Sequence, residues 1–217
     1  HRDGAGDVVQ GWTIAGPGSG VTVHVRGTVE TEDLSGVLRG HRETVAPGCY
    51  LRDTLATQPD VALDRLARSA TAPDDLALAH ALTAAVSEAI AYRPGVTHAH
   101  TTAAEALALG EGVCQDHAHA LVAVARLRGL PARYVSGYLF ATEDGTMHEA
   151  AHAWAELHVA GLGWVGFDPA NRCCPDDRYI RLGSGLDAQD AAPIRGIARG
   201  AGREAMDVTV AILQATQ

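Results

Sequence analysis

A cysteine, a histidine and an aspartate are the residues in this sequence whose chemistry stands out. Cys114 is the first residue of the stretch CQDHAHALVAVARLRGLP. Its small and apolar residues predict a largely buried helix with the thiol in the first turn, and Gly129 and Pro131 indicate where that helix ends. Unpaired backbone N–H groups and the positive end of the helix dipole favour the thiolate there, which is the nucleophilic form. A single cysteine is more often a small buried hydrophobe, so the interpretation as a nucleophile depends on a nearby base.

The chain has 11 histidines, and His152 is distinguished from the others by its position in a predicted hairpin. If Val159 pairs with Gly163 across a three-residue loop, then Asp168 lies opposite Trp154 on the neighbouring strand. His152 is two residues from Trp154 and therefore shares its face, so His152 and Asp168 become diagonal neighbours within reach of a hydrogen bond. A loop with an even number of residues would put them on opposite faces.

Together these residues predict a catalytic triad. Cys114 would attack a carbonyl carbon, His152 would take and return a proton, and Asp168 would fix the tautomer of the imidazole. Each residue alone has an ordinary explanation, such as a surface histidine on a strand or an Asp-Pro turn. The combination, with this geometry, favours a thiol enzyme.

Other residues are candidates for a role around the thiol. Backbone N–H groups near Gly112 and Val113 could hold an oxyanion, and Gly112 would let a substrate backbone approach closely. Trp154 and Tyr138 are candidates for substrate binding, with an ordinary place in the core as the alternative. Asp116 could support the site as a second layer around Cys114, or simply interact with the helix dipole.

The other cysteines and histidines do not indicate a metal site or a disulfide framework. We expect reduced thiols and no metal or cofactor, because neither zinc-type CxxC pairs nor a HExxH motif occurs. Reduced thiols favour a cytoplasmic location, although the chain begins at His1 rather than Met and so shows nothing of a leader segment. The cysteines are Cys49, Cys114, Cys173 and Cys174, and the closely spaced histidine pairs are His98 with His100 and His117 with His119.

Composition limits the partners of the protein. The 217 residues carry a formal net charge of −9, all of the basic residues are arginine, and 47% of the residues are hydrophobic. An acidic chain is a poor partner for nucleic acid or an anionic membrane, and no apolar run is long enough for a membrane span. We therefore expect a peptide or protein substrate, while the oligomeric state has no sequence signal.

The order of the predicted elements is strands, then helices, then strands, which indicates an α+β fold with an antiparallel sheet. Apolar periodicity and capping patterns predict the following elements. Helices are expected at 61–69, 73–91 and 102–110 and from residue 114, and strands at 8–14, 21–30, 132–140, 151–159, 164–168, 178–182 and 206–214.

Three stretches of the chain resemble the bacterial transglutaminase-like proteins: GVCQDHAHALVAVARLRGLPARYVSGYL, HAWAELHVAGLGWVGFDPAN and YIRLGSGLDAQDAAPIRGIARG. Their superfamily also includes peptide N-glycanases and cysteine-protease homologues. The resemblance implies a papain-like core, in which a helix carrying the cysteine packs against an antiparallel sheet carrying the histidine and aspartate. It places the triad on Cys114, His152 and Asp168. Ala151 and Ala170 stand where relatives often have serine and threonine, and neither change removes a catalytic group.

The resemblance also suggests a domain organisation and a range of activities. Residues 73–217 would form the catalytic domain, residues 36–72 an irregular linker, and residues 1–35 the last strands of a truncated N-terminal β domain. The expected activity is that of a cysteine peptidase or amidase acting through an acyl-enzyme. The alternatives are a transglutaminase, which uses an amine acceptor, and a non-catalytic binding or scaffold protein that keeps the fold.

Overall fold

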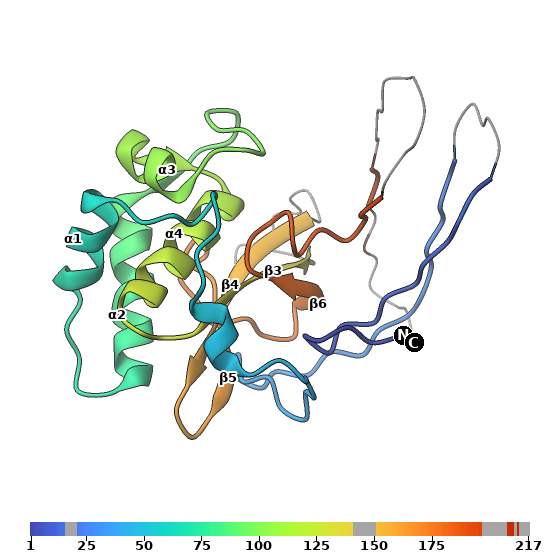
Figure 1. Cartoon of the computed structure of the whole chain (residues 1–217), viewed down its shortest axis with the longest axis horizontal. Coiled ribbons are helices and arrows are strands. Elements are labelled where there is room, and N and C mark those ends of the chain that lie inside the picture. The colour runs from blue at the N-terminus through green and yellow to red at the C-terminus, as the bar shows by residue number, and fades with distance from the viewer. Residues whose placement is uncertain (16–20, 141–150, 197–207, 211, 213–217) are drawn as a thin grey trace.

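A four-stranded antiparallel sheet and a group of helices beside it form the body of the protein in the computed structural model (Figure 1). The structure describes residues 1–15, 21–140, 151–196, 208–210 and 212. The sheet has the strand order β5-β4-β3-β6, made of β3 (Ala132–Leu139), β4 (Ala151–Val159), β5 (Gly163–Phe167) and β6 (Tyr179–Gly185). The helices are η1 (Pro47–Leu51), α1 (Val61–Ser69), α2 (Asp75–Ala89), α3 (Ala103–Leu109) and α4 (Cys114–Leu127), and two short strands, β1 (Ala91–Tyr92) and β2 (Glu111–Gly112), pair in parallel.

The hairpin between β4 and β5 has the register that the sequence predicts. Val159 pairs with Gly163 and Ala155 pairs with Phe167, so the connecting loop contains three residues. Gly161 and Gly163 adopt φ angles of 81° and 82°, in the left-handed region that glycine enters without a steric penalty. The odd loop length places His152 and Asp168 on the same side of the hairpin.

The helix ends follow from local capping chemistry. The Thr102 side chain accepts a hydrogen bond from the N–H of Glu105, and the Glu105 side chain accepts one from the N–H of Thr102, which forms the predicted capping box of α3. Gly110 ends α3 with a φ of 72°. Asp74 caps α2 by accepting a hydrogen bond from the N–H of Ala77. The predicted helices, and the strands predicted between residues 130 and 185, are confirmed within about three residues.

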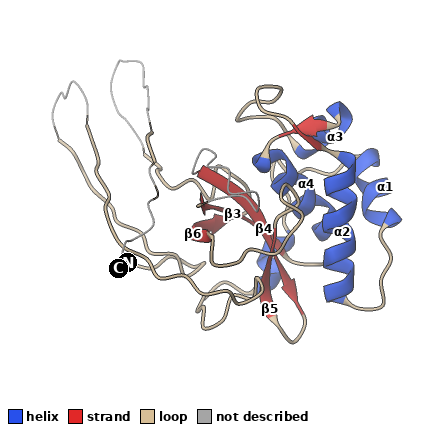
Figure 2. Ribbon diagram, turned by 180° about the vertical axis from the view of Figure 1, so that it is seen from behind, coloured by secondary structure: helices blue, strands red, loops and turns tan. Residues whose placement is uncertain are grey.

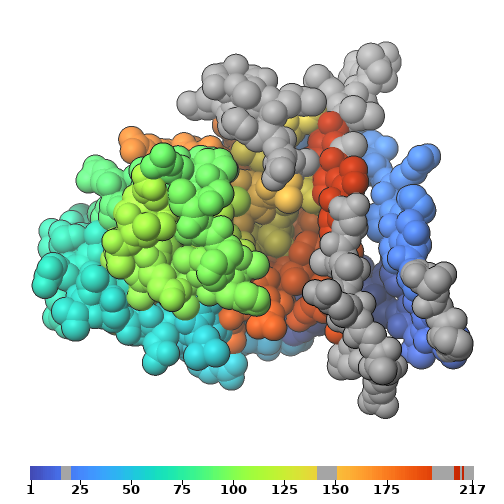
Figure 3. Space-filling model, turned by 90° about the horizontal axis from the view of Figure 1, so that it is seen from above, coloured from blue at the N-terminus to red at the C-terminus, as the bar shows by residue number. Residues whose placement is uncertain are grey.

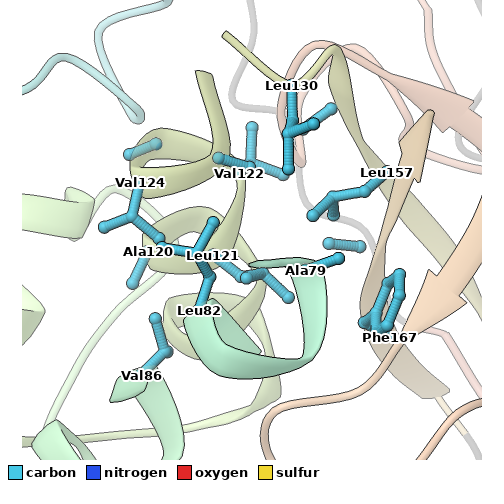
Figure 4. Packing of buried hydrophobic residues seen from close by; sticks show 14 of the residues in the cluster. Ala79, Leu82, Val86, Ala120, Leu121, Val122, Val124, Leu130, Leu157 and Phe167 are labelled. Atoms are coloured by element: carbon cyan, nitrogen blue, oxygen red, sulfur yellow. The ribbon is translucent and has the colours of Figure 1, made fainter. Parts of the chain in front are cut away.

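The main hydrophobic core lies between α4, the neighbouring helices and the sheet. Side chains of α2 and α4 pack against Leu130, Leu157 and Phe167 in this core (Figure 4). The side chains of Leu121 and Leu157 are fully buried. Burying a leucine side chain contributes roughly 1.5–3 kcal/mol. Because α4 packs on both sides, its axis is fixed relative to β4, and the position of Cys114 at its first residue is fixed with it.

The N-terminal part of the chain differs from the prediction. Apart from a single bridge of Val8 to Arg2, residues 8–14 and 21–30 belong to no strand, and all of their valine side chains except that of Val9 are exposed. They run as two extended segments that project away from the helices (Figures 1 and 2). The predicted strands are wrong here because no described segment extends the pair into a sheet, and two strands alone are marginal in water.

The last strand predicted from the sequence can be compared with the structure only in part. The strand predicted at 206–214 lies largely outside the described residues, and its described positions 208–210 and 212 are not in a strand.

Viewed from above, the helices adjoin the sheet on one side, while the N-terminal segments lie on the opposite side of the sheet (Figure 3). The division into a truncated β domain, a linker and a catalytic domain stays a prediction. Across the described chain, none of the helices has the length and apolarity that crossing a membrane would require.

Candidate active site

Cys114 is the first residue of α4 and is partly exposed. It packs against a small cluster formed by Ala118, Tyr134, Ala153 and Ala191. The first N–H groups of a helix have no partner within the helix, and the N–H of Cys114 has no acceptor among the described residues. The thiol therefore lies beside a free donor at the positive end of the helix dipole.

Asp116 organises the turn that leads into α4. Its Oδ2 accepts hydrogen bonds from the N–H of Val113 at 2.8 Å and from the hydroxyl of Thr97 at 2.6 Å. The N–H of Val113 is therefore occupied, and the prediction that it could hold an oxyanion is wrong. Asp116 is almost fully buried, and it supports the Cys114 turn from behind, as a capping residue.

Gly112 serves the same turn in a way that the sequence did not suggest. A Cβ atom at this position would lie 2.7 Å from the Oδ2 atom of Asp116. The carbonyl of Gly112 accepts a hydrogen bond from the N–H of Arg93 at 2.7 Å. The absence of a side chain is thus required by the close approach of Asp116, whereas an approach of substrate to Gly112 stays a prediction.

His152 and Asp168 are in direct contact. The distance between His152 Nε2 and Asp168 Oδ2 is 2.6 Å, and the side chains are 9% and 0% exposed. Because Nε2 faces the carboxylate, Nδ1 is the ring nitrogen left for the thiol. A hydrogen bond with Cys114 also contributes to the pKa of His152. The structure therefore brings together the three residues that the sequence singled out.

The Asp168 carboxylate is held by more groups than the sequence predicted. Its Oδ1 accepts hydrogen bonds from the N–H groups of Ala170 and Asn171. Its Oδ2 accepts hydrogen bonds from the Asn171 amide and from the Tyr179 hydroxyl, both at 2.8 Å, in addition to that from His152. Asn171 could have been recognised from its place in a turn after an aspartate. Tyr179 could not, because only the pairing of β6 with β3 brings it to the site.

The charges in this site stabilise one another. Burial lowers the pKa of His152, but hydrogen bonds to Asp168 and Cys114 outweigh it and raise the value to about 10. Burial raises the pKa of Asp168, and the hydrogen bond and positive charge of His152 more than offset this, so the pKa lies below its usual value. At neutral pH the pair is an imidazolium facing a carboxylate.

Trp154 and Tyr138 occupy different places around Cys114, His152 and Asp168. The Trp154 indole is buried and stacks over the His152 ring, with 6.3 Å between ring centroids. Its Nε1 lies next to Gly166 of β5, and its ring packs with Tyr179. Its role in substrate binding stays a prediction. Tyr138 is half-buried on β3 opposite Ala151, and its role in substrate binding stays a prediction.

The histidines close to Cys114 are engaged in structural contacts. Both ring nitrogens of His117 face backbone carbonyls, those of Val113 and Ile90, at 2.9 and 2.8 Å. His119 Nε2 accepts a hydrogen bond from the N–H of Ala188. Within the described part of the chain, no group of three or more metal-ligating side chains comes together.

Comparison with known proteins identifies the class. The model of the transglutaminase-like superfamily matches residues 64–169, which include Cys114, His152 and Asp168. An uncharacterized protein of Mycobacterium leprae is 33% identical over 220 residues, covering 95% of this chain and 78% of that protein. The chain belongs to the transglutaminase-like superfamily, with the α+β, papain-like fold of that group.

A solved structure and a relative with a named activity match smaller parts of the chain. A Cytophaga hutchinsonii protein, described provisionally as a cysteine protease, is 30% identical with a TM-score of 0.57, covering 66% of this chain and 48% of that one. A protein-glutamine gamma-glutamyltransferase of Pseudomonas aeruginosa is 33% identical over 86 residues, which are 35% of this chain and 12% of that protein. The chain thus spans half or less of these two proteins.

Proposed function

We propose that this protein is a thiol enzyme that forms an acyl-enzyme on an amide carbonyl of a peptide or protein, and that water is its usual acceptor. The observation that carries the proposal is the contact of His152 Nε2 with buried Asp168 at 2.6 Å, with the other ring nitrogen left for Cys114. Membership of a superfamily of transglutaminases and cysteine-protease homologues supports the same chemistry. The activity would be that of a cysteine peptidase or amidase.

The reaction proceeds in two halves. The Cys114 thiolate attacks the carbonyl carbon, a C–S bond forms, and the carbonyl π electrons move to the oxygen. When this intermediate collapses, the C–N bond breaks and the imidazolium of His152 gives its proton to the leaving amine. Neutral His152 then takes a proton from water, which attacks the thioester, and the acid product leaves as the thiolate and imidazolium are restored.

Acyl transfer to an amine is the second candidate. In that case a primary amine replaces water in the second half, and an amide product forms. The similarity to the gamma-glutamyltransferase of Pseudomonas aeruginosa favours this alternative. Both acceptors use the same acyl-enzyme, so the two activities differ only in which nucleophile reaches the thioester.

A peptide library incubated with and without a primary amine separates these outcomes by mass spectrometry. Hydrolysis adds the mass of water to each cleaved bond or replaces an amide by an acid, whereas acyl transfer adds the amine with loss of ammonia or a peptide fragment. Cys114→Ala is expected to keep the fold and lose all products. Full activity of Cys114→Ala would refute the nucleophile, and an inert wild-type protein would favour the scaffold alternative.

The thiol itself gives a second, substrate-free test. We expect iodoacetamide at neutral pH to alkylate Cys114 faster than Cys173, since burial raises the pKa of the Cys173 thiol and disfavours its reactive thiolate. Peptide mapping of the alkylated protein measures both rates. Labelling of Cys173 as fast as Cys114 would contradict an activated nucleophile at position 114.

A further inference from the structure

Tyr134 lies beside the nucleophile on β3. Its side chain is 5% exposed, and it belongs to the small cluster of Ala118, Ala153 and Ala191 against which Cys114 packs. The ring contacts that of His119 from the second turn of α4, with 4.9 Å between centroids. Because His119 is itself anchored through Nε2 to the N–H of Ala188, the phenol ring is held in place next to the thiol.

The hydroxyl of Tyr134 has no hydrogen-bond partner among the described residues. Among the described residues, the side-chain N and O atoms that are both fully buried and without a partner are Asp116 Oδ1, His119 Nδ1 and Arg133 Nη2. The Tyr134 hydroxyl is not one of them, although it too has no partner there. The hydroxyl oxygen therefore reaches the accessible surface next to the cluster that contains Cys114. A tyrosine hydroxyl in such a setting normally has a partner, and here the partner would come from outside the chain.

We propose that the Tyr134 hydroxyl donates a hydrogen bond to the oxyanion that forms when Cys114 attacks a carbonyl, together with the N–H of Cys114. This inference rests on the proposed function and supplies the second donor of the oxyanion hole. The first donor is the free N–H at the start of α4, and the neighbouring N–H of Val113 is already bound by Asp116. The Trp154 indole packs with Tyr179 and its Nε1 lies next to Gly166, whereas Tyr134 belongs to the cluster against which Cys114 packs.

The electrostatics of the pocket suit a donor that keeps its proton. Burial raises the pKa of Tyr134 well above its usual value, and the negative charges of Cys114, Asp116 and Asp187 raise it further. The phenol stays protonated at neutral pH, as a hydrogen-bond donor must. Phenol groups serve as oxyanion donors in other enzymes, and removing one donor from an oxyanion hole lowers kcat by about 10²–10³-fold.

The hydroxyl can be tested with two reagents that react with the same sulfur. A peptide aldehyde adds to Cys114 to give a hemithioacetal, whose oxyanion needs donors, whereas iodoacetamide alkylates the sulfur without forming one. The affinity of a set of N-acetyl dipeptide aldehydes is measured by their protection of Cys114 against alkylation. The variant is Tyr134→Phe, and the control is Tyr50→Phe, which removes a hydroxyl from a buried tyrosine that contacts Trp164 and Arg133 instead.

We expect Tyr134→Phe to bind the aldehydes at least about tenfold more weakly than the wild type, while its rate of alkylation by iodoacetamide stays unchanged. Tyr50→Phe should match the wild type in aldehyde affinity and in alkylation rate. Unchanged aldehyde affinity in Tyr134→Phe would overturn the inference and leave the proposed function intact. An alkylation rate that changes as much as the aldehyde affinity would also overturn it, because the hydroxyl would then act on the sulfur. A wild-type protein that neither binds aldehydes nor alkylates at Cys114 would refute the proposed function itself.

Discussion

The pair formed by His152 and Asp168 decides over which pH range the imidazole carries a charge. Hydrogen bonds to Asp168 and Cys114 overcome burial and raise the pKa of His152 to about 10. In the proposed reaction the imidazolium protonates the leaving amine, so activity should persist up to about pH 10 and then fall. Alkylation of the thiol needs no proton from His152 and should show no such loss.

Substitution of Asp168→Asn tests this at the level of one residue. The variant removes the carboxylate that contributes most to raising the pKa of His152, so the pKa falls and the alkaline loss of activity moves to lower pH. At neutral pH we expect kcat/KM to drop about 10²-fold or more, as in other triads that lose their acid. Profiles of kcat/KM and of alkylation rate against pH measure both effects.

The control for this experiment is Asp176→Asn. Asp176 pairs with Arg178 and is one-quarter exposed on the same segment of the chain, but it does not contact the imidazole. Its pH profile should coincide with that of the wild type. If Asp168→Asn kept the alkaline limit of the wild type, Asp168 would not be the group that holds the charge on His152.

At the scale of elements, Gly137 determines how closely β3, β4 and β6 approach. A Cβ atom there would overlap the carbonyl oxygen of Ile180 and lie 2.5 Å from the Trp154 ring. Since Gly137 pairs with His152 across the β3–β4 ladder, Gly137→Ala should displace both the indole and the histidine. We expect a loss of about 1–3 kcal/mol in unfolding free energy and a loss of activity, measured by urea denaturation and by the peptide assay.

Gly48→Ala is the matched control for Gly137→Ala. A Cβ atom at Gly48 would meet no atom within 4 Å, and the residue lies in η1, away from the sheet ladders. Its stability should equal or slightly exceed that of the wild type, because alanine restricts the unfolded chain more than glycine does. Equal stability of the two variants would mean that the sheet relaxes around residue 137 at no cost.

The elements that the sequence predicted well are those set by local chemistry. The capping box at Thr102, the left-handed Gly110 and the odd loop before Gly163 each specify a boundary within a few residues. The hairpin parity then placed His152 beside Asp168, because the side-chain period of a strand is fixed at two residues.

The features that the sequence missed depend on neighbours distant in the chain. The alternation of valines in residues 21–30 is typical of a strand, but a strand also needs a partner, which the described chain does not supply. Tyr179 reaches Asp168 only through the β3–β6 pairing. The Val113 N–H looked free because the rotamer of Asp116, which binds it, cannot be deduced from sequence.

At the scale of the whole molecule, buried charges connect the N-terminal segment to the four-stranded sheet. Glu156 of β4 is 3% exposed, and its two oxygens are bound by Arg133 at 2.7 Å and Arg181 at 2.8 Å. Arg133 also binds Glu43, and Arg181 also binds Asp7. Asp7 is therefore bound to β6 and Glu43 to β3, through charges that centre on Glu156.

The network makes stability depend on acid in a defined pH range. Burial raises the pKa of Glu156, but Arg181 and Arg133 outweigh it and lower the value to about 2, compared with an ordinary value of 4.5. A carboxylate with a lowered pKa in the folded state stabilises that state above pH 4.5, and this contribution is lost as the pH falls toward 2. Wild-type stability should decline over that interval.

Glu156→Gln should remove this contribution and leave the buried Arg133 and the partly buried Arg181 short of a counter-charge. We expect a loss of about 3–5 kcal/mol at pH 7, the usual consequence of removing one partner of a buried ion pair, and a flatter stability curve between pH 4.5 and 2. Urea denaturation at several pH values measures the loss of stability and the shape of the curve.

The control is Asp64→Asn, which breaks an exposed pair with Arg68. It should change neither the stability at pH 7 nor its pH dependence measurably, since exposed pairs contribute little. If Glu156→Gln declined as steeply as the wild type below pH 4.5, other carboxylates would be responsible for the acid sensitivity.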